Sequence, residues 1–184
     1  MRPPSKTPSA ENGPRVETIP EGDDRTRLMC PDCGFIQYEN PKIIVGAVVR
    51  LDDRILLCRR AIDPRLGFWT LPAGYLELNE APDQGARREA WEEATAKIEI
   101  GSLLAIYDIP RLSQVQLIYR ARLIDEVIKP GIESQAVTLF KWGEIPWPEI
   151  AFPTVRWALR HDRELGDTEI FTPRTNPRGE SDLP

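Results

Sequence analysis

The chain has 184 residues, of which 41% are hydrophobic and 29% charged, and these values are typical of a soluble globular protein with one main domain. Lys and Arg total 24 and Asp and Glu total 29, so the formal net charge of −5 argues against a general nucleic-acid or anionic-membrane binder. The sequence contains no long apolar run and no apolar block near the N-terminus, so we expect no membrane partner and a cytoplasmic location. Three cysteines are too few for a disulfide framework, which agrees with a reducing compartment.

The two ends of the chain are polar and rich in proline. Residues 1–29 show almost no apolar periodicity, which predicts a mobile N-terminal arm. Residues 168–184 contain three prolines and no core pattern, which predicts a disordered C-terminal tail. The predicted folded domain therefore spans residues 38–167, and residues 30–37 hold a short cysteine-containing turn before it.

The folded part opens with two apolar segments. Residues 43–49 form a β-branched run, and residues 55–58 form a second one. Asp52 and Asp53 between them are typical turn residues. These segments predict a β-hairpin.

A charged helix follows an irregular loop over residues 61–70. We predict this helix over residues 80–96, with Asn79 as its N-cap and Pro82 in its first turn, where a missing N–H costs little. Strands and helices are mixed without regular βαβ alternation, which predicts an α/β (α+β) class with a mixed sheet. The remaining predicted elements are strands at 98–108, 114–124 and 136–141 and an amphipathic helix at 154–165.

Three carboxylates lie close together on the charged helix. Glu89, Glu92 and Glu93 are three and four residues apart, so they project from one side of it. Their mutual repulsion destabilises an isolated helix by roughly 0.2–0.5 kcal/mol per pair, and a bound cation offsets that repulsion. Carboxylate oxygens suit Mg²⁺ or Mn²⁺. The alternative is a solvated acidic face balanced by Arg87 and Arg88.

The segment around this helix resembles the Nudix box of the Nudix hydrolases. That box is a Gly, five residues, Glu, seven residues, Arg-Glu, an aliphatic residue, any residue, Glu-Glu, any residue, Gly and an aliphatic residue. One position departs, because Thr95 stands where the box has Gly, and we expect it to loosen or lengthen the last helical turn. The matching residues are Gly74, Glu80, Arg88, Glu89, Ala90, Glu92, Glu93 and Ala96.

The flanking segments resemble one branch of that family, the FAD- and ADP-ribose-type pyrophosphatases with an N-terminal zinc ribbon. The likeness extends from about residue 9 to 165 and includes S-Q-V at 113–115, G-I-E-S at 131–134 and E-I-P-W at 144–147. It implies the Nudix fold, a mixed β-sheet sandwiched between helices. It also implies a homodimer, as is frequent among related pyrophosphatases, and specificity set by the loops at 61–70, 109–116 and 129–136.

The resemblance also implies roles for the box residues. Glu89 and Glu93 are the expected metal ligands, completed by Glu92 and by a backbone carbonyl at Ala73 or Gly74. The expected cofactor is Mg²⁺, with Mn²⁺ as a substitute. Either helix glutamate could orient or deprotonate the attacking water, and the sequence leaves both open. The remaining pair, Glu80 and Arg88, matches a salt bridge that holds the loop onto the helix.

Residues outside the box are weaker candidates. Glu133 is a candidate base on a later loop, whereas Ala136 stands where this branch has another Glu; the alternative for Glu133 is a plain surface position. Arg59 and Arg60 are candidates for binding phosphate, or else a pair of surface charges. Gln114 matches a branch-typical position. The candidates for stacking on a base or flavin are Trp69, Phe68, Tyr75 and Trp91.

Cys30 and Cys33 form one half of a zinc ribbon. The sequence has no second C-x-x-C motif. The upstream segment that corresponds to the other half of the ribbon is residues 9–13, and both of its zinc-ligand positions are replaced by other residues. We therefore expect a degenerate ribbon without zinc, unless two chains pool their cysteines across a dimer. Cys58 is expected in the core, and the single histidine, His161, is expected to face solvent.

The sequence thus predicts a Mg²⁺-dependent pyrophosphohydrolase. Its substrate would be a nucleoside diphosphate linked to another moiety, such as ADP-ribose, FAD or NADH, and its products two monophosphates. Two alternatives stay open, a pyrophosphatase that sanitises (d)NTPs and a nucleotide-sensing module that binds without hydrolysis. A nucleic-acid-binding ribbon protein is disfavoured by the acidic charge.

Overall fold

The computed structural model describes residues 13–179 and divides the chain into two compact units, Met1–Asn40 and Pro41–Pro184. The smaller unit holds three short antiparallel strands in the order β1-β2-β3. Their bounds are β1 (Val16–Thr18), β2 (Arg27–Met29) and β3 (Ile36–Gln37). The Nε of Arg27, the first residue of β2, lies 2.9 Å from Oδ2 of Asp23 in the turn between β1 and β2.

This small sheet differs from the mobile arm that we predict over residues 1–29. Over residues 13–29 the chain is held by backbone pairing, turns and ion pairs. Strands of two or three residues are too short to show apolar alternation, so the sequence pattern does not reveal them. Residues 1–12 lie outside the described residues, and with them most of residues 9–13, the segment that corresponds to the other half of the zinc ribbon.

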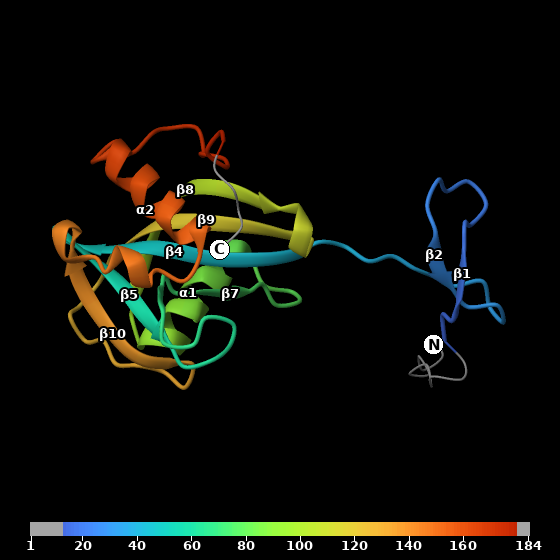
Figure 1. The fold of residues 1–184 in the computed structure, drawn as a ribbon, viewed down its shortest axis with the longest axis horizontal. Coiled ribbons are helices and arrows are strands. Elements are labelled where there is room, and N and C mark those ends of the chain that lie inside the picture. The colour runs from blue at the N-terminus through green and yellow to red at the C-terminus, as the bar shows by residue number, and fades with distance from the viewer. Residues whose placement is uncertain (1–12, 180–184) are drawn as a thin grey trace. The chain divides into compact units, whose positions relative to one another are not determined.

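The larger unit is built on a seven-stranded mixed sheet (Figure 1). Five strands run in the order β10-β5-β4-β9-β8, while β6 pairs with β5 and β7 with β4. The β4–β9 pair is parallel and the others are antiparallel. The strands are β4 (Lys42–Leu51), β5 (Arg54–Arg60), β6 (Trp69–Thr70), β7 (Ala73–Tyr75), β8 (Ile98–Ile109), β9 (Gln114–Leu123) and β10 (Ser134–Lys141).

Two long helices cover opposite faces of this sheet. Successive strand residues point to opposite faces, and on β4 Val48 packs in the cluster that includes Trp157, whereas Ala47 packs in the cluster that includes Ala90. The result is the sandwich that the sequence predicts and confirms the α/β class. These helices are α1 (Pro82–Ala94) and α2 (Pro153–Leu165). Three short helices also lie between them in the chain, η1 (Pro110–Leu112), η2 (Trp142–Glu144) and η3 (Trp147–Glu149). Among the described residues, none of the helices is long and apolar enough to cross a bilayer.

Helix α1 begins two residues later than predicted. Pro82 occupies its first position, and the side chain of Gln84 accepts a hydrogen bond from the Ala81 N–H at 3.1 Å. Asn79 is not the cap; it has a φ of 65° in the preceding turn. The helix therefore starts from a proline that presets the backbone angle.

Helix α1 ends abruptly at Thr95, where we expect a loose or longer last turn. Thr95 itself takes the left-handed conformation, with φ 50° and ψ 25°, that glycine usually supplies. Its hydroxyl donates to the Lys129 carbonyl at 3.2 Å. This contact with a neighbouring loop offsets part of the strain of a β-branched residue in that conformation.

The C-terminal segment is also ordered further than predicted. Arg174 bridges to Ala105 of β8, and the amide of Asn176 donates to the Asp108 carbonyl at 2.8 Å. Phe171 packs on the core. The prolines that suggest disorder are here compatible with an extended strand along a sheet edge. Residues 180–184 lie outside the described residues.

Candidate active site

Arg88 organises the start of the site. Its guanidinium donates to both carboxylate oxygens of Glu80, at 2.9 and 3.1 Å, and to the Tyr75 carbonyl at 2.9 Å. It also donates to Glu89 at 2.7 Å and to Glu92 at 2.8 Å. One arginine therefore ties the loop before α1 to two helix carboxylates, as expected for the Glu80–Arg88 pair.

Glu89 and Glu93 lie on the buried side of α1. Their exposed fractions are 8% and 6%, while Glu92 is exposed. The backbone N–H of Ala73 donates to the Glu93 carboxylate. The other oxygen, Glu93 Oε2, is buried without a hydrogen-bond partner among the described residues. A buried carboxylate oxygen in this state is unfavourable and is a natural place for a cation.

The electrostatics of the two buried carboxylates agree with this geometry. Burial raises the pKa of Glu93 to about 8, and the charge of Glu89 adds to the increase. Burial also raises the pKa of Glu89, although the Arg88 guanidinium opposes it. By contrast, hydrogen bonds from Arg88 lower the pKa of Glu80. Glu80 is thus a satisfied ion-pair partner, whereas the surroundings of Glu89 and Glu93 disfavour their charged forms in the absence of a cation.

Gly74 gives the Glu89 carboxylate its room. A Cβ atom built on Gly74 would lie 2.5 Å from all three carboxyl atoms of Glu89. Gly74 belongs to β7, which pairs with β4 and runs past the buried side of α1. A residue with a Cβ at this position would therefore displace the Glu89 carboxylate from its place against the strand backbone.

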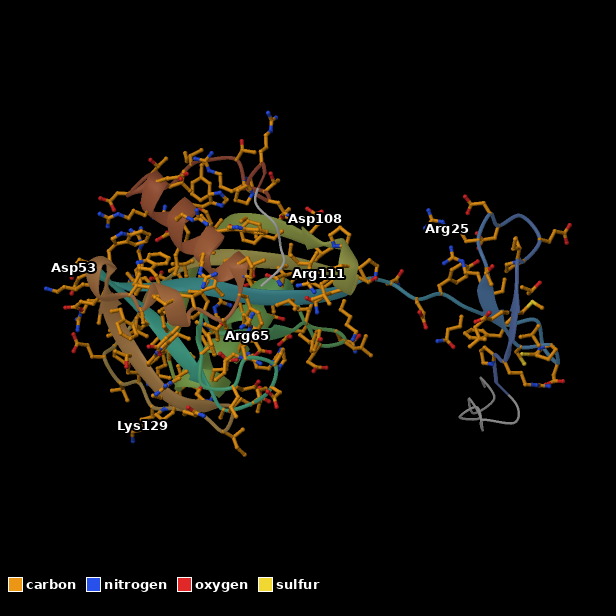
Figure 2. All side chains as sticks on the ribbon, viewed as in Figure 1. Arg25, Asp53, Arg65, Asp108, Arg111 and Lys129 are labelled. Carbon is orange, nitrogen blue, oxygen red and sulfur yellow. The ribbon has the colours of Figure 1, made fainter. Side chains whose placement is uncertain are left out.

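The carboxylates open onto a cavity of about 1030 Å³. Much of its lining is apolar, and besides Arg88 the guanidiniums of Arg60, Arg65 and Arg111 also line it. Figure 2 shows that Arg65 comes from the loop between β5 and β6 and Arg111 from the turn between β8 and β9. The loops expected to set specificity, at 61–70, 109–116 and 129–136, each contribute to the lining.

Most of the predicted site residues meet in this cavity. Its lining includes the helix carboxylates with Arg88, the β7 backbone and the candidates on other elements: Glu89, Glu92, Glu93, Arg88, Ala73, Gly74, Arg60, Gln114 and Glu133. Glu80 lies behind Arg88 and does not line it. Of the aromatic candidates Tyr75 lines the cavity, whereas Phe68 and Trp91 do not.

Arg59 and Trp69, which we expect to bind substrate, do not line this cavity. Arg59 precedes Arg60 on β5, so its side chain points to the other face and donates to the Gly67 carbonyl at 2.8 Å. Trp69 is buried in the core, where its ring meets Phe140 edge-on at 5.0 Å. Residue type alone does not distinguish a core tryptophan from one that stacks on a base.

The loop before β10 carries Glu133 into the cavity. Gly131 anchors this loop, because its N–H donates to the Glu93 carbonyl at 3.0 Å. A Cβ atom on Gly131 would lie 1.6 Å from the Glu92 carbonyl oxygen. Ala136, where this branch has a Glu, instead packs against the core. Glu133 is therefore the acidic candidate that this loop brings into the cavity.

Several lining residues are absent from the sequence prediction. Gln116 lies two residues after Gln114 on β9, so strand alternation places both on the same face and could have identified it. Arg65, Arg111 and Phe152 carry no such signal, because turns and the start of α2 bring them to the cavity. Their positions depend on packing between elements.

Cys58 and His161, the other two residues considered in the sequence analysis, do not line the cavity. Cys58 is buried, as predicted, and burial raises the pKa of its thiol well above the ordinary value. His161 is half-buried rather than solvent-facing, and its Nδ1 lies 2.8 Å from the Tyr107 hydroxyl. Neither residue therefore reaches the cavity.

Comparisons with known proteins agree with this site. A NUDIX domain model matches residues 40–158, and a Nudix N-terminal model matches residues 12–39. The chain is 46% identical to the crystal structure of a NUDIX hydrolase from Nitrosomonas europaea, with a TM-score of 0.82 and coverage of 87% of this chain and 91% of that one.

Two curated relatives are more distant. A MutT-like protein from Streptomyces ambofaciens is 39% identical over 102 residues, which is 55% of this chain and 64% of the relative. An ADP-ribose pyrophosphatase from Methanocaldococcus jannaschii is 26% identical over 113 residues, 59% of this chain and 67% of the relative. The matched stretches thus span about two thirds of these relatives. From its box residues, its mixed-sheet sandwich and the match over residues 40–158, the chain belongs to the Nudix hydrolase family.

Proposed function

We propose that this protein is a divalent-metal-dependent pyrophosphohydrolase that cleaves a nucleoside diphosphate linked to another moiety into two monophosphates. The observation that carries the proposal is the placement of Glu89, Glu92 and Glu93 at one wall of the 1030 Å³ cavity. Acidic side chains face a space large enough for a dinucleotide-sized ligand. A carboxylate wall alone would repel pyrophosphate, so the arrangement requires a cation between the two.

The residues present fit Mg²⁺ or Mn²⁺. The buried Glu93 Oε2 has no partner among the described residues, and Gly74 has no side chain that would occupy the space beside the Glu89 carboxylate. We propose that Glu89, Glu92 and Glu93 hold the ion together with the backbone at Ala73 or Gly74. A metal ion bound there supplies charge stabilisation for the phosphoryl oxygens. Hard oxygen donors and space for waters and phosphate suit both ions.

The chain's own groups would complete the chemistry. Arg60 lines the cavity, with its Nε bound to the Pro64 carbonyl at 2.8 Å, which leaves its other N–H groups for a phosphate. Glu133 and Glu93 are the candidates for orienting water and accepting its proton as its oxygen bonds to phosphorus. The bond between the attacked phosphorus and the bridging oxygen breaks, and the bridging oxygen departs with the leaving phosphate. Arg88 and Glu80 keep the glutamates in place.

The apolar part of the lining favours substrates with a base or flavin ring. Leu71, Ile118 and Phe152 offer a dry surface, with Gln114 and Gln116 as hydrogen-bonding groups beside it. We propose ADP-ribose, FAD or NADH as the substrate class; the Methanocaldococcus relative is itself named an ADP-ribose pyrophosphatase. Triphosphates need less of the apolar lining than these two-part molecules.

A metal-dependent activity screen tests this proposal. Purified protein is incubated with Mg²⁺ or Mn²⁺ and with ADP-ribose, FAD, NADH and dNTPs, and the products are separated by chromatography. Release of two monophosphates from a linked nucleoside diphosphate supports the proposal. Pyrophosphate released from dNTPs alone supports the sanitising alternative. Tight nucleotide binding with no turnover of any substrate identifies a sensing module instead.

A further inference from the structure

In the smaller unit, Cys30 and Cys33 lie in a turn that backbone hydrogen bonds close. The Cys30 N–H donates to the Phe35 carbonyl at 2.8 Å, and the Gly34 N–H donates to the Cys30 carbonyl at 2.9 Å. The backbone N–H groups of Asp32 and Cys33 donate to the Cys30 sulfur. Gly34 has a φ of 72°, which closes the turn. This is the geometry of a turn that presents two sulfur ligands.

The residues of this unit do not fit a zinc ion. A structural zinc site takes four ligands, usually cysteine or histidine. Cys30 and Cys33 are the only cysteines in residues 1–40, and the single histidine is His161, in the other unit. Within the described part of this unit, residues 13–40, no three His, Cys, Asp or Glu side chains are grouped as metal ligands. One chain thus offers half of the required set.

A different cation, the guanidinium of Arg15, lies next to this turn. Its Nη1 lies 2.7 Å from Asp32 Oδ2 and 3.3 Å from the Gly13 carbonyl. The same Asp32 oxygen lies 3.9 Å from the Cys30 sulfur, so the carboxylate connects the guanidinium to the turn. The Arg15 N–H donates to the Met29 carbonyl at 3.0 Å, which fixes its backbone next to the turn. A guanidinium has five N–H donors, so it can join several acceptors from two segments.

We propose that the N-terminal unit is a metal-free ribbon in which the Arg15 guanidinium joins the Cys30–Cys33 turn to the segment before β1, in the role that zinc plays in the ribbon. The family model that matches residues 12–39 is the zinc-ribbon segment of Nudix proteins. The two cations exclude one another, because a dication beside the turn would be repelled by the guanidinium and would compete for the Cys30 sulfur. The positive charge is retained, but it comes from a side chain.

Metal content tests the first part of the proposal. The full chain is produced with added Zn²⁺ and purified without chelator, and zinc is measured by elemental analysis. We expect about 0.1 zinc per chain or less, and no change in thermal unfolding when a zinc chelator is added. One zinc per chain would overturn the proposal. About half a zinc per chain, lost together with a dimer on chelation, would show instead that two chains pool their cysteines.

Variants test the role of Arg15. Arg15→Gln removes the charge, and we expect proteolysis within residues 13–40 to become at least about threefold faster, with zinc content unchanged. Arg25→Gln is the matched control, because Arg25 is an exposed arginine of the same unit with only a 3.7 Å contact to exposed Asp24 (Figure 2). Equal proteolysis of the two variants would overturn the role of Arg15. Asp32→Asn, which removes the acceptor, should reproduce the effect of Arg15→Gln.

Discussion

Glu93 shows how a single residue can serve function at the expense of stability. Its carboxylate is buried, one oxygen has no partner among the described residues, and Glu89 lies near enough to raise its pKa. Each of these features disfavours the charged form in the folded state. Such a carboxylate is expected where a bound cation compensates the charge, so stability and activity should respond to it in opposite directions.

Glu93→Gln separates the two effects. We expect it to lower turnover by about 10²-fold or more, because a proposed metal ligand and candidate base is lost. We also expect it to raise the free energy of unfolding of the metal-free protein by about 1 kcal/mol, because glutamine is neutral in both states and does not have to take up a proton when it is buried. Steady-state kinetics and urea denaturation measure the two. Glu149→Gln, at an exposed position in η3, should change neither.

If Glu93→Gln kept full activity while folded, the assignment of Glu93 as a metal ligand would be wrong. If it lost activity and also unfolded more readily, the carboxylate would have a structural partner in the metal-free protein that the geometry does not show.

At the scale of elements, the active site depends on a loop that docks onto the end of α1. The Lys129 N–H donates to the Ala94 carbonyl at 2.9 Å, and the Gly131 N–H to the Glu93 carbonyl at 3.0 Å. The Thr95 hydroxyl donates to the Lys129 carbonyl in return. The last carbonyls of a helix have no partner within the helix, so this loop satisfies them while it positions Glu133.

Gly131→Ala tests this docking. The added methyl group would overlap the Glu92 carbonyl oxygen at 1.6 Å, so we expect the loop to move and turnover to fall by about tenfold or more. Gly143→Ala is the matched control, since a Cβ atom there meets nothing within 4 Å and Gly143 does not have a left-handed φ. Comparable kinetics for the two variants would show that Glu133 does not need this anchored loop.

At the scale of the whole larger unit, Asp162 joins three elements. This fully buried residue of α2 accepts from Arg50 of β4 at 2.6 Å and from Arg120 of β9 at 2.8 Å. Arg120 also donates to the carbonyls of Gly166 and Thr168 after α2. One carboxylate therefore fixes α2 on the sheet, and α2 begins at the cavity with Phe152 and Thr154.

Asp162→Asn should destabilise the folded protein. Two arginines would lose their charged acceptor, and we expect the free energy of unfolding to fall by about 2–3 kcal/mol. Asp167→Asn is the control, because Asp167 is fully exposed and lies 4.0 Å from the same Arg50; we expect a change below about 0.5 kcal/mol. Urea denaturation measures both, and equal changes would show that the buried ion pairs contribute no more than the exposed one.

Relations within one element or one short segment follow from the amino-acid sequence alone. Helical periodicity places Glu89, Glu92 and Glu93 within reach of one another, and the box spacing brings Gly74 and Glu80 next to them. Strand patterns locate the main sheet because its strands are long enough to show apolar runs. These relations follow from backbone geometry over a few residues, so no distant contact can change them.

Contacts between side chains of separate elements, by contrast, depend on how the chain folds in three dimensions. Arg60 reaches the cavity and Arg59 does not, Trp69 enters the core, and Arg111 and Phe152 arrive from a turn and from the start of α2. The ribbon and the C-terminal segment are likewise held by contacts between segments. Such positions depend on how elements pack and on which backbone groups they satisfy, and neither is encoded in the periodicity of a single segment.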